Sequence, residues 1–235
     1  ESGDLIAQTE ESTSPVSFDV GLHSVVLQVT DDSGLFNNDT TTVRVYPRIP
    51  NIVINELMIE TQAAIDSDDG EYIELLNLDE EDVDISGWTL ETTSDELILS
   101  EGEPLIIPSQ GHILLARSSN WYWAGDVEID YIYGEVPLDN SEETILLSTS
   151  LGQLVEDVSY DSSWDAVSGS DGNKSMERIS PFLLSNDSES WTNSSAGLGD
   201  YDLYGTPGAE NSAQIFTGDP YVDEFYLSFG EEGDN

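Results

Sequence analysis

Residues 144–160 read Thr144-Ile145-Leu146-Leu147-Ser148-Thr149-Ser150-Leu151-Gly152-Gln153-Leu154-Val155-Glu156-Asp157-Val158-Ser159-Tyr160. Apolar residues alternate or cluster over two short runs, 144–148 and 154–160, and the residues between the runs favour a turn. This pattern is typical of a hairpin on a half-buried sheet. Because short strands of this kind recur at even spacing along the chain, the sequence predicts an all-β antiparallel sandwich.

The hairpin belongs to an ordered series of short signatures between residues 51 and 211. The series contains Ile54-Asn55-Glu56-Leu57, Gly70-Glu71-Tyr72-Ile73-Glu74-Leu75 with Asn77, Asp84-Ile85-Ser86-Gly87-Trp88-Thr89-Leu90, Leu105-Ile106-Ile107-Pro108, Gly111-His112-Ile113-Leu114-Leu115, Leu138-Asp139-Asn140, Lys174-Ser175-Met176-Glu177-Arg178, Ser190-Trp191-Thr192 and Gly205-Thr206-Pro207-Gly208-Ala209-Glu210-Asn211. In content and order this series resembles the lamin-tail domain in its prokaryotic, extracellular form.

The resemblance implies an immunoglobulin-like β-sandwich over residues 49–212. It implies no reaction, because no catalytic residues are assigned to this module, and we therefore expect that the chain is not an enzyme. Prokaryotic members of the family occur in large secreted proteins beside adhesive immunoglobulin-like domains, nucleases or other hydrolases. Within the sandwich we expect Trp88, Trp164 and Trp191, with Ile145, to pack in the core, since buried aromatic residues contribute strongly to small domains.

Residues 1–48 resemble the C-terminal part of a PKD-type immunoglobulin-like domain. Residues 23–30 and 41–46 are the expected strands, with Val25, Leu27 and Val29 on one side of the first. This segment is about half the length of such a domain and too short to bury a large core, so we expect the chain to begin within a domain. Pro47 and Pro50 mark the linker that follows.

The composition is strongly acidic: 49 Asp and Glu residues oppose 5 Lys and Arg residues, which gives a formal net charge of −44. Such a chain repels polyanions, so nucleic acid is not an expected partner. No apolar run approaches the ~18 residues of a membrane span, so direct membrane insertion is not expected either. Disorder is the competing interpretation of so high a charge, but five Trp, ten Tyr and six Phe residues and the alternating strands favour a folded chain. An extracellular or cell-surface location in a salt-adapted or marine prokaryote, such as an archaeon, suits this composition.

One loop has the carboxylates of a calcium site. Asp66, Asp68, Asp69 and Glu71 lie around Gly70, just before a predicted strand, and hard oxygen ligands at this spacing suit Ca²⁺. Gly70 occupies the third ligand position of an EF-hand, so the match to that motif fails. A solvated acidic loop is the alternative in so acidic a chain, and no cofactor is required.

Four Asn-x-Ser/Thr sequons provide candidate glycosylation sites at Asn38, Asn173, Asn186 and Asn193. Glycosylation at any of these asparagines would identify the chain as part of a surface glycoprotein.

Catalytic motifs are absent from the sequence. His23 and His112 fall in predicted strands far apart, and there is no Cys nucleophile. We expect Glu56, Glu71 and Glu74 to cap strand ends or bond to backbone groups rather than to act as acids or bases.

Three functions remain open. The first is a structural or adhesive module of a large secreted or cell-surface protein, whose partners are neighbouring immunoglobulin-like modules or copies of itself. The second is a non-catalytic accessory module of a secreted hydrolase or nuclease. The third is a module that binds extracellular polysaccharide, with exposed Trp121, Tyr122 and Trp123 as the platform.

Residues 213–235 are an acidic tail, a linker or a strand of a following domain. Within them, Tyr221 to Phe229 has the length and alternation of a strand, with Val222, Phe225, Leu227 and Phe229 available for burial. One interpretation is strand addition to a neighbouring domain or subunit, which yields a head-to-tail filament when the contact does not close. The other is that the chain is an excised piece whose missing strands lie on either side.

Overall fold

Antiparallel strands make up nearly all the regular structure of the computed structural model, which describes residues 17–61, 70–121, 126–134, 136–168, 172–199 and 202–213. Helical geometry within these ranges is limited to α1 (Asp165–Ser168) and the 3₁₀ turn η1 (Ser188–Ser190). The predicted all-β class is therefore confirmed. The chain divides into two units, Glu1–Arg48 and Ile49–Asn235.

The first unit is a single hairpin among its described residues. Strands β1 (Gly21–Thr30) and β2 (Phe36–Val45) pair antiparallel along their whole length. In the turn, Asp31 Oδ1 accepts hydrogen bonds from the backbone amides of Ser33 and Leu35 at 2.8 and 2.9 Å. Both predicted strands are confirmed, although β2 begins five residues earlier than expected, because this turn allows pairing up to Phe36. The PKD-type assignment of this segment stays a prediction.

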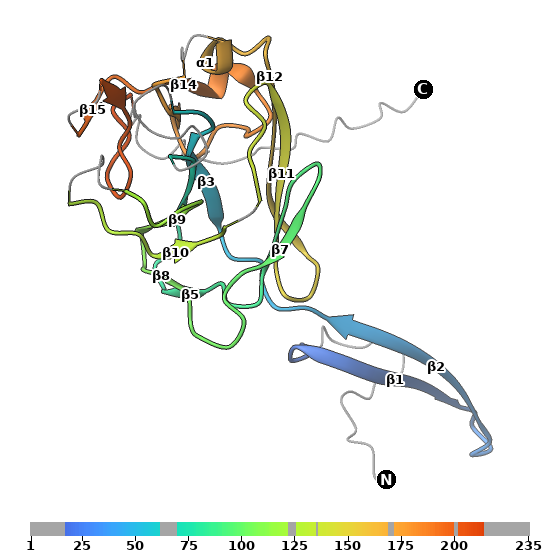
Figure 1. Cartoon of the computed structure of the whole chain (residues 1–235). Helices are drawn as coiled ribbons and strands as arrows, with labels where there is room; N and C mark the ends of the chain where they lie inside the picture. Colours follow the sequence, from blue (N-terminus) through green and yellow to red (C-terminus); the bar gives the residue numbers. More distant parts are fainter. Residues whose placement is uncertain are drawn as a thin grey trace, which may run out of the picture. The chain divides into compact units, whose positions relative to one another are not determined.

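The second unit contains a six-stranded sheet, shown with the other elements in Figure 1. Its strands, in spatial order, are β10 (Tyr131–Ile132), β9 (His112–Ala116), β4 (Tyr72–Asn77), β3 (Ile52–Met58), β13 (Met176–Arg178) and β14 (Trp191–Asn193). All neighbours are antiparallel except β10 and β9. The sheet therefore joins residues from both ends of the unit.

A four-stranded sheet faces it, built from β12 (Leu154–Asp161), β11 (Glu142–Ser148), β6 (Thr89–Glu91) and β7 (Glu96–Ile98). Strands β11 and β12 form the hairpin predicted from residues 144–160, with a bulge next to the turn. Two small ribbons complete the unit, β5 (Val83–Asp84) with β8 (Ile106–Ile107), and β15 (Gly197–Leu198) with β16 (Leu203–Tyr204).

The main core lies between the two large sheets. Ile54, Ile73 and Leu115 of the six-stranded sheet join Leu90, Ile145, Leu147 and Val158 of the four-stranded sheet in one buried cluster. Trp88, Trp164 and Trp191 belong to the same cluster and are at most 7 % exposed, as expected. This arrangement confirms an antiparallel sandwich.

The outer face of the six-stranded sheet is buried too. Met58, Tyr72, Leu114 and Ala116 form a second cluster there with Trp121, Leu198 and Leu203. Every residue of β3 and β4 is consequently buried, although one face of an antiparallel sheet is commonly solvated. The expected exposure of Trp121 is wrong: its ring is 6 % exposed and packs edge-on against Tyr72, 5.5 Å between centroids. Tyr122 and Trp123 lie outside the described residues.

None of the described helices is long and apolar enough to cross a membrane.

Candidate functional site

Three glutamates stand in a row across the outer face of the six-stranded sheet. Glu56 on β3 pairs in register with Glu74 on β4 and with Glu177 on β13. Strand alternation directs them outward, because neighbours such as Leu57, Ile73 and Met176 point into the main core. All three glutamates are 0 % exposed. Like charges directly opposite one another on a sheet are destabilising, so this row needs compensation.

The compensation comes from the last described residues of the unit, 205–213, which we call the C-terminal strap. Each glutamate accepts one backbone amide from it: Glu56 from Thr206 at 2.8 Å, Glu74 from Gly208 at 2.7 Å and Glu177 from Ala213 at 3.2 Å. The strap turns at Pro207 and Gly208, where Gly208 has a positive φ of 77°, a conformation that favours glycine. The row of glutamates thereby fastens the strap to the sheet.

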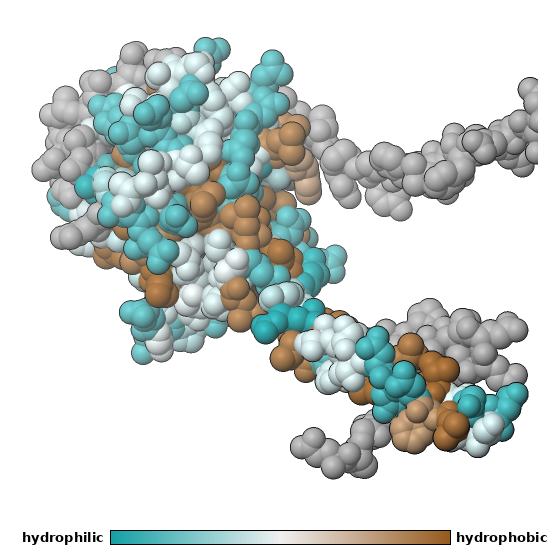
Figure 2. All heavy atoms as spheres, turned by 90° about the vertical axis from the view of Figure 1, so that its right-hand side faces the viewer, coloured by the Kyte–Doolittle hydropathy of each residue, from teal (hydrophilic) through white to brown (hydrophobic). Residues whose placement is uncertain are grey.

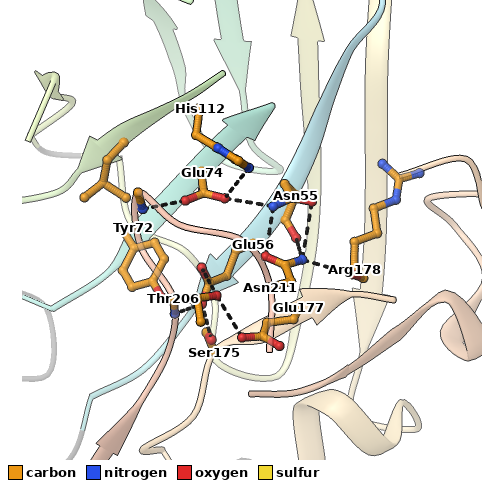
Figure 3. Close-up of polar contacts among 12 residues, drawn as sticks. Asn55, Glu56, Tyr72, Glu74, His112, Ser175, Glu177, Arg178, Thr206 and Asn211 are labelled. Atoms are coloured by element: carbon orange, nitrogen blue, oxygen red, sulfur yellow. Dashed lines mark hydrogen bonds and ion pairs between the residues drawn. The ribbon is translucent and has the colours of Figure 1, made fainter. Parts of the chain in front are cut away.

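Side-chain hydroxyls complete the coordination of Glu56, as Figure 3 shows. Its Oε1 accepts from Tyr72 at 2.7 Å and from Ser175 at 2.5 Å. The Thr206 hydroxyl lies 3.1 Å from Glu56 Oε2 and 2.9 Å from Glu177 Oε1. The strap is thus bonded through its side chains as well as its backbone.

Two asparagines tie the far end of the strap to β3. Asn55 Nδ2 donates to Glu74 Oε1 at 2.8 Å and to Asn211 Oδ1 at 2.9 Å. Asn211 Nδ2 in turn donates to the carbonyl oxygens of Asn55 and Arg178, at 3.1 and 2.9 Å. Both asparagines are buried, so these bonds satisfy polar groups that water does not reach.

Burial strongly shifts the acidity of the row. Removal from water raises the pKa of Glu56 from an ordinary 4.5 to about 7, with a further contribution from the charge of Glu177 and against the lowering effect of its hydrogen bonds. Burial, followed by repulsion from Glu56, also raises the pKa of Glu74 well above its usual range. In mildly acidic solution, between the ordinary pKa of 4.5 and about 7, Glu56 therefore favours the protonated form, whereas an exposed glutamate is ionised.

No positive charge among the described groups neutralises this row. His112 Nε2 lies 3.8 Å from Glu74 Oε1, but burial lowers the pKa of His112, opposed by the charge of Glu210. Its imidazole is therefore predominantly neutral near neutral pH. Arg178 lies beside the row on β13, yet its guanidinium pairs with Glu156 of the opposite sheet at 3.0 Å.

The Arg178–Glu156 pair links the two sheets of the sandwich. Arg178 and Glu156 are only 2 % and 9 % exposed. The guanidinium also donates to the carbonyl of Leu183 at 2.6 Å and lies 5.6 Å from the ring centroid of Trp191. This is a buried structural ion pair with its own hydrogen-bond partners.

The predicted calcium loop is described only at Glu71. One carboxylate oxygen of Glu71 pairs with Arg117 at 2.5 Å, and the other accepts from the Leu138 amide at 3.0 Å. Asp66, Asp68 and Asp69 lie outside the described residues, so the calcium site stays a prediction. Within the described ranges, no group of three or more His, Asp or Glu residues is arranged to hold a metal ion.

The four sequons differ in their surroundings. Asn38 is exposed on β2, and Asn173 is half-buried. The Asn186 side chain accepts from the Ser159 amide at 2.6 Å and donates to Asp157, and that of Asn193 donates to the Asp165 carbonyl at 3.2 Å. The proposed assembly residues Val222, Phe225, Leu227 and Phe229 lie outside the described part of the chain.

The expectation for Glu56, Glu71 and Glu74 holds in one respect, since each accepts a backbone amide. That expectation does not include the full burial of Glu56 and Glu74 within strands, nor the position of Glu177 in the same row, opposite Glu56. A signal was present in the sequence, because Ile54-Asn55-Glu56-Leu57-Met58 and Tyr72-Ile73-Glu74-Leu75-Leu76 each place one carboxylate inside an apolar run. Such a residue requires a buried partner.

Comparison with known families agrees with this architecture. No curated protein sequence matches the chain. Residues 47–162 match the family model described as Lamin Tail Domain, an immunoglobulin-like β-sandwich. The six-stranded sheet continues beyond the matched residues, through β13 and β14. On the sequence match and the sandwich together, residues 47–162 of this chain are a lamin tail domain.

Proposed function

We propose that the chain is a structural or adhesive module of a large secreted or cell-surface protein, and that it assembles with neighbouring modules or copies of itself by strand addition. The lamin tail domain supports a modular role. The sealed position of its polar cluster favours a structural role for those carboxylates, since all three are shielded from solvent. The acidic composition supports an extracellular, salt-rich setting, in which screening reduces self-repulsion.

The observation that carries the assembly proposal is the surface of the β1–β2 hairpin. Leu22, Val26, Leu27, Val29 and Phe36 are each more than half exposed, and Figure 2 shows apolar residues over the hairpin. Neither strand has another hydrogen-bonded neighbour among the described residues. Free strand edges and uncovered apolar side chains both promote association.

The occupant we propose is the segment that contains Val222, Phe225, Leu227 and Phe229, supplied by another copy or by the next module. Its alternating apolar residues suit an extended strand on an apolar surface. Backbone hydrogen bonds supply affinity in such a contact without opposite charges, which suits a chain with only five basic residues.

Light scattering over a concentration series tests this proposal. The full chain is expected to exceed monomer mass, and a chain that ends at Ala213 is expected to remain a monomer. Replacing Leu27 and Val29 by Lys should also reduce the mass, because both side chains are exposed and their loss spares the fold. A full chain that is monomeric at every concentration, or a truncated chain of unchanged higher mass, would overturn strand addition.

A further inference from the structure

The hydroxyl of Thr206 reveals how protons are distributed in the glutamate row. It lies within hydrogen-bond distance of Glu56 Oε2 and of Glu177 Oε1. A hydroxyl has one hydrogen and can donate it fully to only one of two carboxylate oxygens. Both contacts become hydrogen bonds when one carboxyl is protonated and donates to the Thr206 oxygen. We assign this proton to Glu56 Oε2, with Thr206 donating onward to Glu177.

The other described contacts of the glutamate row are consistent with a proton on Glu56, because none of them brings a positive charge to the row. The described partners of Glu56 and Glu177 are hydroxyls and backbone amides, which are neutral. The titratable groups that face Glu56 are Glu74 and Tyr72 from β4 and Glu177 from β13. His112 lies beside Glu74, and the charge of Glu210 acts on His112. None of these supplies a full positive charge near neutral pH.

Loss of the proton leaves buried carboxylates opposite one another. Hydrogen bonds from the strap favour the ionised form, but burial outweighs them, as the raised pKa of Glu56 indicates. Release of the strap is the direct way to bring water to these oxygens, because the strap supplies one amide to each glutamate. Residues 205–213 contain no strand of either large sheet, so release of the strap leaves those strands paired.

We propose that the strap, residues 205–213, is a proton-dependent latch that closes over the sheet in mildly acidic solution and loosens as the solution approaches and passes neutral pH. Opening exposes the outer face of β3, β4 and β13, together with the strap's own backbone amides. The latch couples the pH of the surroundings to the accessibility of this face.

The pH window follows from proton linkage. In the open strap Glu56 returns toward its ordinary pKa of 4.5, whereas in the closed strap the value is about 7. Opening therefore releases the Glu56 proton between these values, so the contribution of Glu56 to the opening constant rises with pH across this window and levels off above it. The full rise corresponds to roughly 300-fold, since each pKa unit is a factor of ten.

Hydrogen exchange of individual amides tests the latch. We expect the protection factors of Thr206, Gly208 and Ala213, corrected for intrinsic exchange, to fall by roughly 100-fold between pH 5 and pH 7.5. In Glu56→Gln the side-chain amide can donate to Thr206 permanently, so the part of the pH dependence that comes from Glu56 should be lost, and protection of the Thr206 amide should vary less with pH than in the wild type. The matched control Glu143→Gln, another buried carboxyl that accepts backbone amides, should behave like the wild type.

Comparison with the β11–β12 amides separates local opening from global unfolding. A latch requires the strap amides to be less protected than those of Ile145 and Val158 near neutral pH. Equal protection at every pH would show that the strap opens only when the whole unit unfolds, and would overturn the proposal. So would a wild-type strap whose protection does not change with pH, a result that needs no variant.

Discussion

Replacing Arg178 by Met should destabilise the second unit by about 4 kcal/mol. Methionine keeps much of the apolar stem, but Glu156 would be left as a buried charge without its partner, and removing one member of a buried ion pair typically costs about 3–5 kcal/mol. The carbonyl of Leu183 and the ring of Trp191 also lose the guanidinium. Most of the expected loss of stability thus comes from leaving the Glu156 carboxylate buried without a partner, rather than from losing its attraction to Arg178.

Urea unfolding at neutral pH, followed by tryptophan fluorescence, measures this change. The double variant Arg178→Met with Glu156→Leu should recover to within about 2 kcal/mol of the wild type, because no buried charge remains. Arg44→Met, which removes an exposed cation from β2, controls for the change in net charge and should alter the unfolding free energy by less than about 0.5 kcal/mol. A loss below about 1 kcal/mol in Arg178→Met, or a double variant as unstable as the single one, would refute this reasoning.

Three further predictions concern packing, salt and metal. Gly205→Ala should lower the unfolding free energy by about 2 kcal/mol, because a Cβ at residue 205 would lie 2.5 Å from the Tyr72 hydroxyl. Gly197→Ala, where nothing lies within 4 Å of the added Cβ, is the matched control in urea unfolding, and equal effects of the two substitutions would argue against tight packing of the strap. The melting temperature should rise between low and molar salt, since screening reduces repulsion in a chain of charge −44; a flat or falling melting temperature contradicts this expectation. EDTA should change the melting temperature only modestly, and a drop of more than about ten degrees would instead establish a calcium site around Asp66 and Glu71.

The sandwich was predictable because its signals are local. Alternation in residues 144–160 predicts β11 and β12, and the apolar surroundings of Trp88 and Ile145 place them in the core, where the structure has them. Hairpin pairing and strand faces follow from a period of two residues.

The glutamate row was not predictable in the same way, because it depends on contacts between distant parts of the chain. Glu56 and Thr206 are 150 residues apart, and the strap joins them by covering a sheet face that usually meets water. For the same reason Trp121 was expected on the surface: the residues that bury it on the outer face include Leu198 and Leu203, which follow it by more than 70 positions in the sequence. Local pattern identifies a strand but not what covers its second face.

The most direct test of the central claim, a proton held in the buried row, is the pH dependence of unfolding free energy in the wild type and in Glu56→Gln. A raised pKa means that the native state binds more protons than the unfolded chain, so the contribution of Glu56 is fully present below pH 4.5 and is lost as pH rises through about 7. The expected loss is about 3 kcal/mol, and the variant should escape it. Subtracting the two curves removes the opposite contributions of Asp84, Asp139 and Asp161, whose hydrogen bonds lower their pKa values. The account predicts that the variant gains about 3 kcal/mol on the wild type between pH 4.5 and pH 8; a difference that stays constant over this range would contradict it.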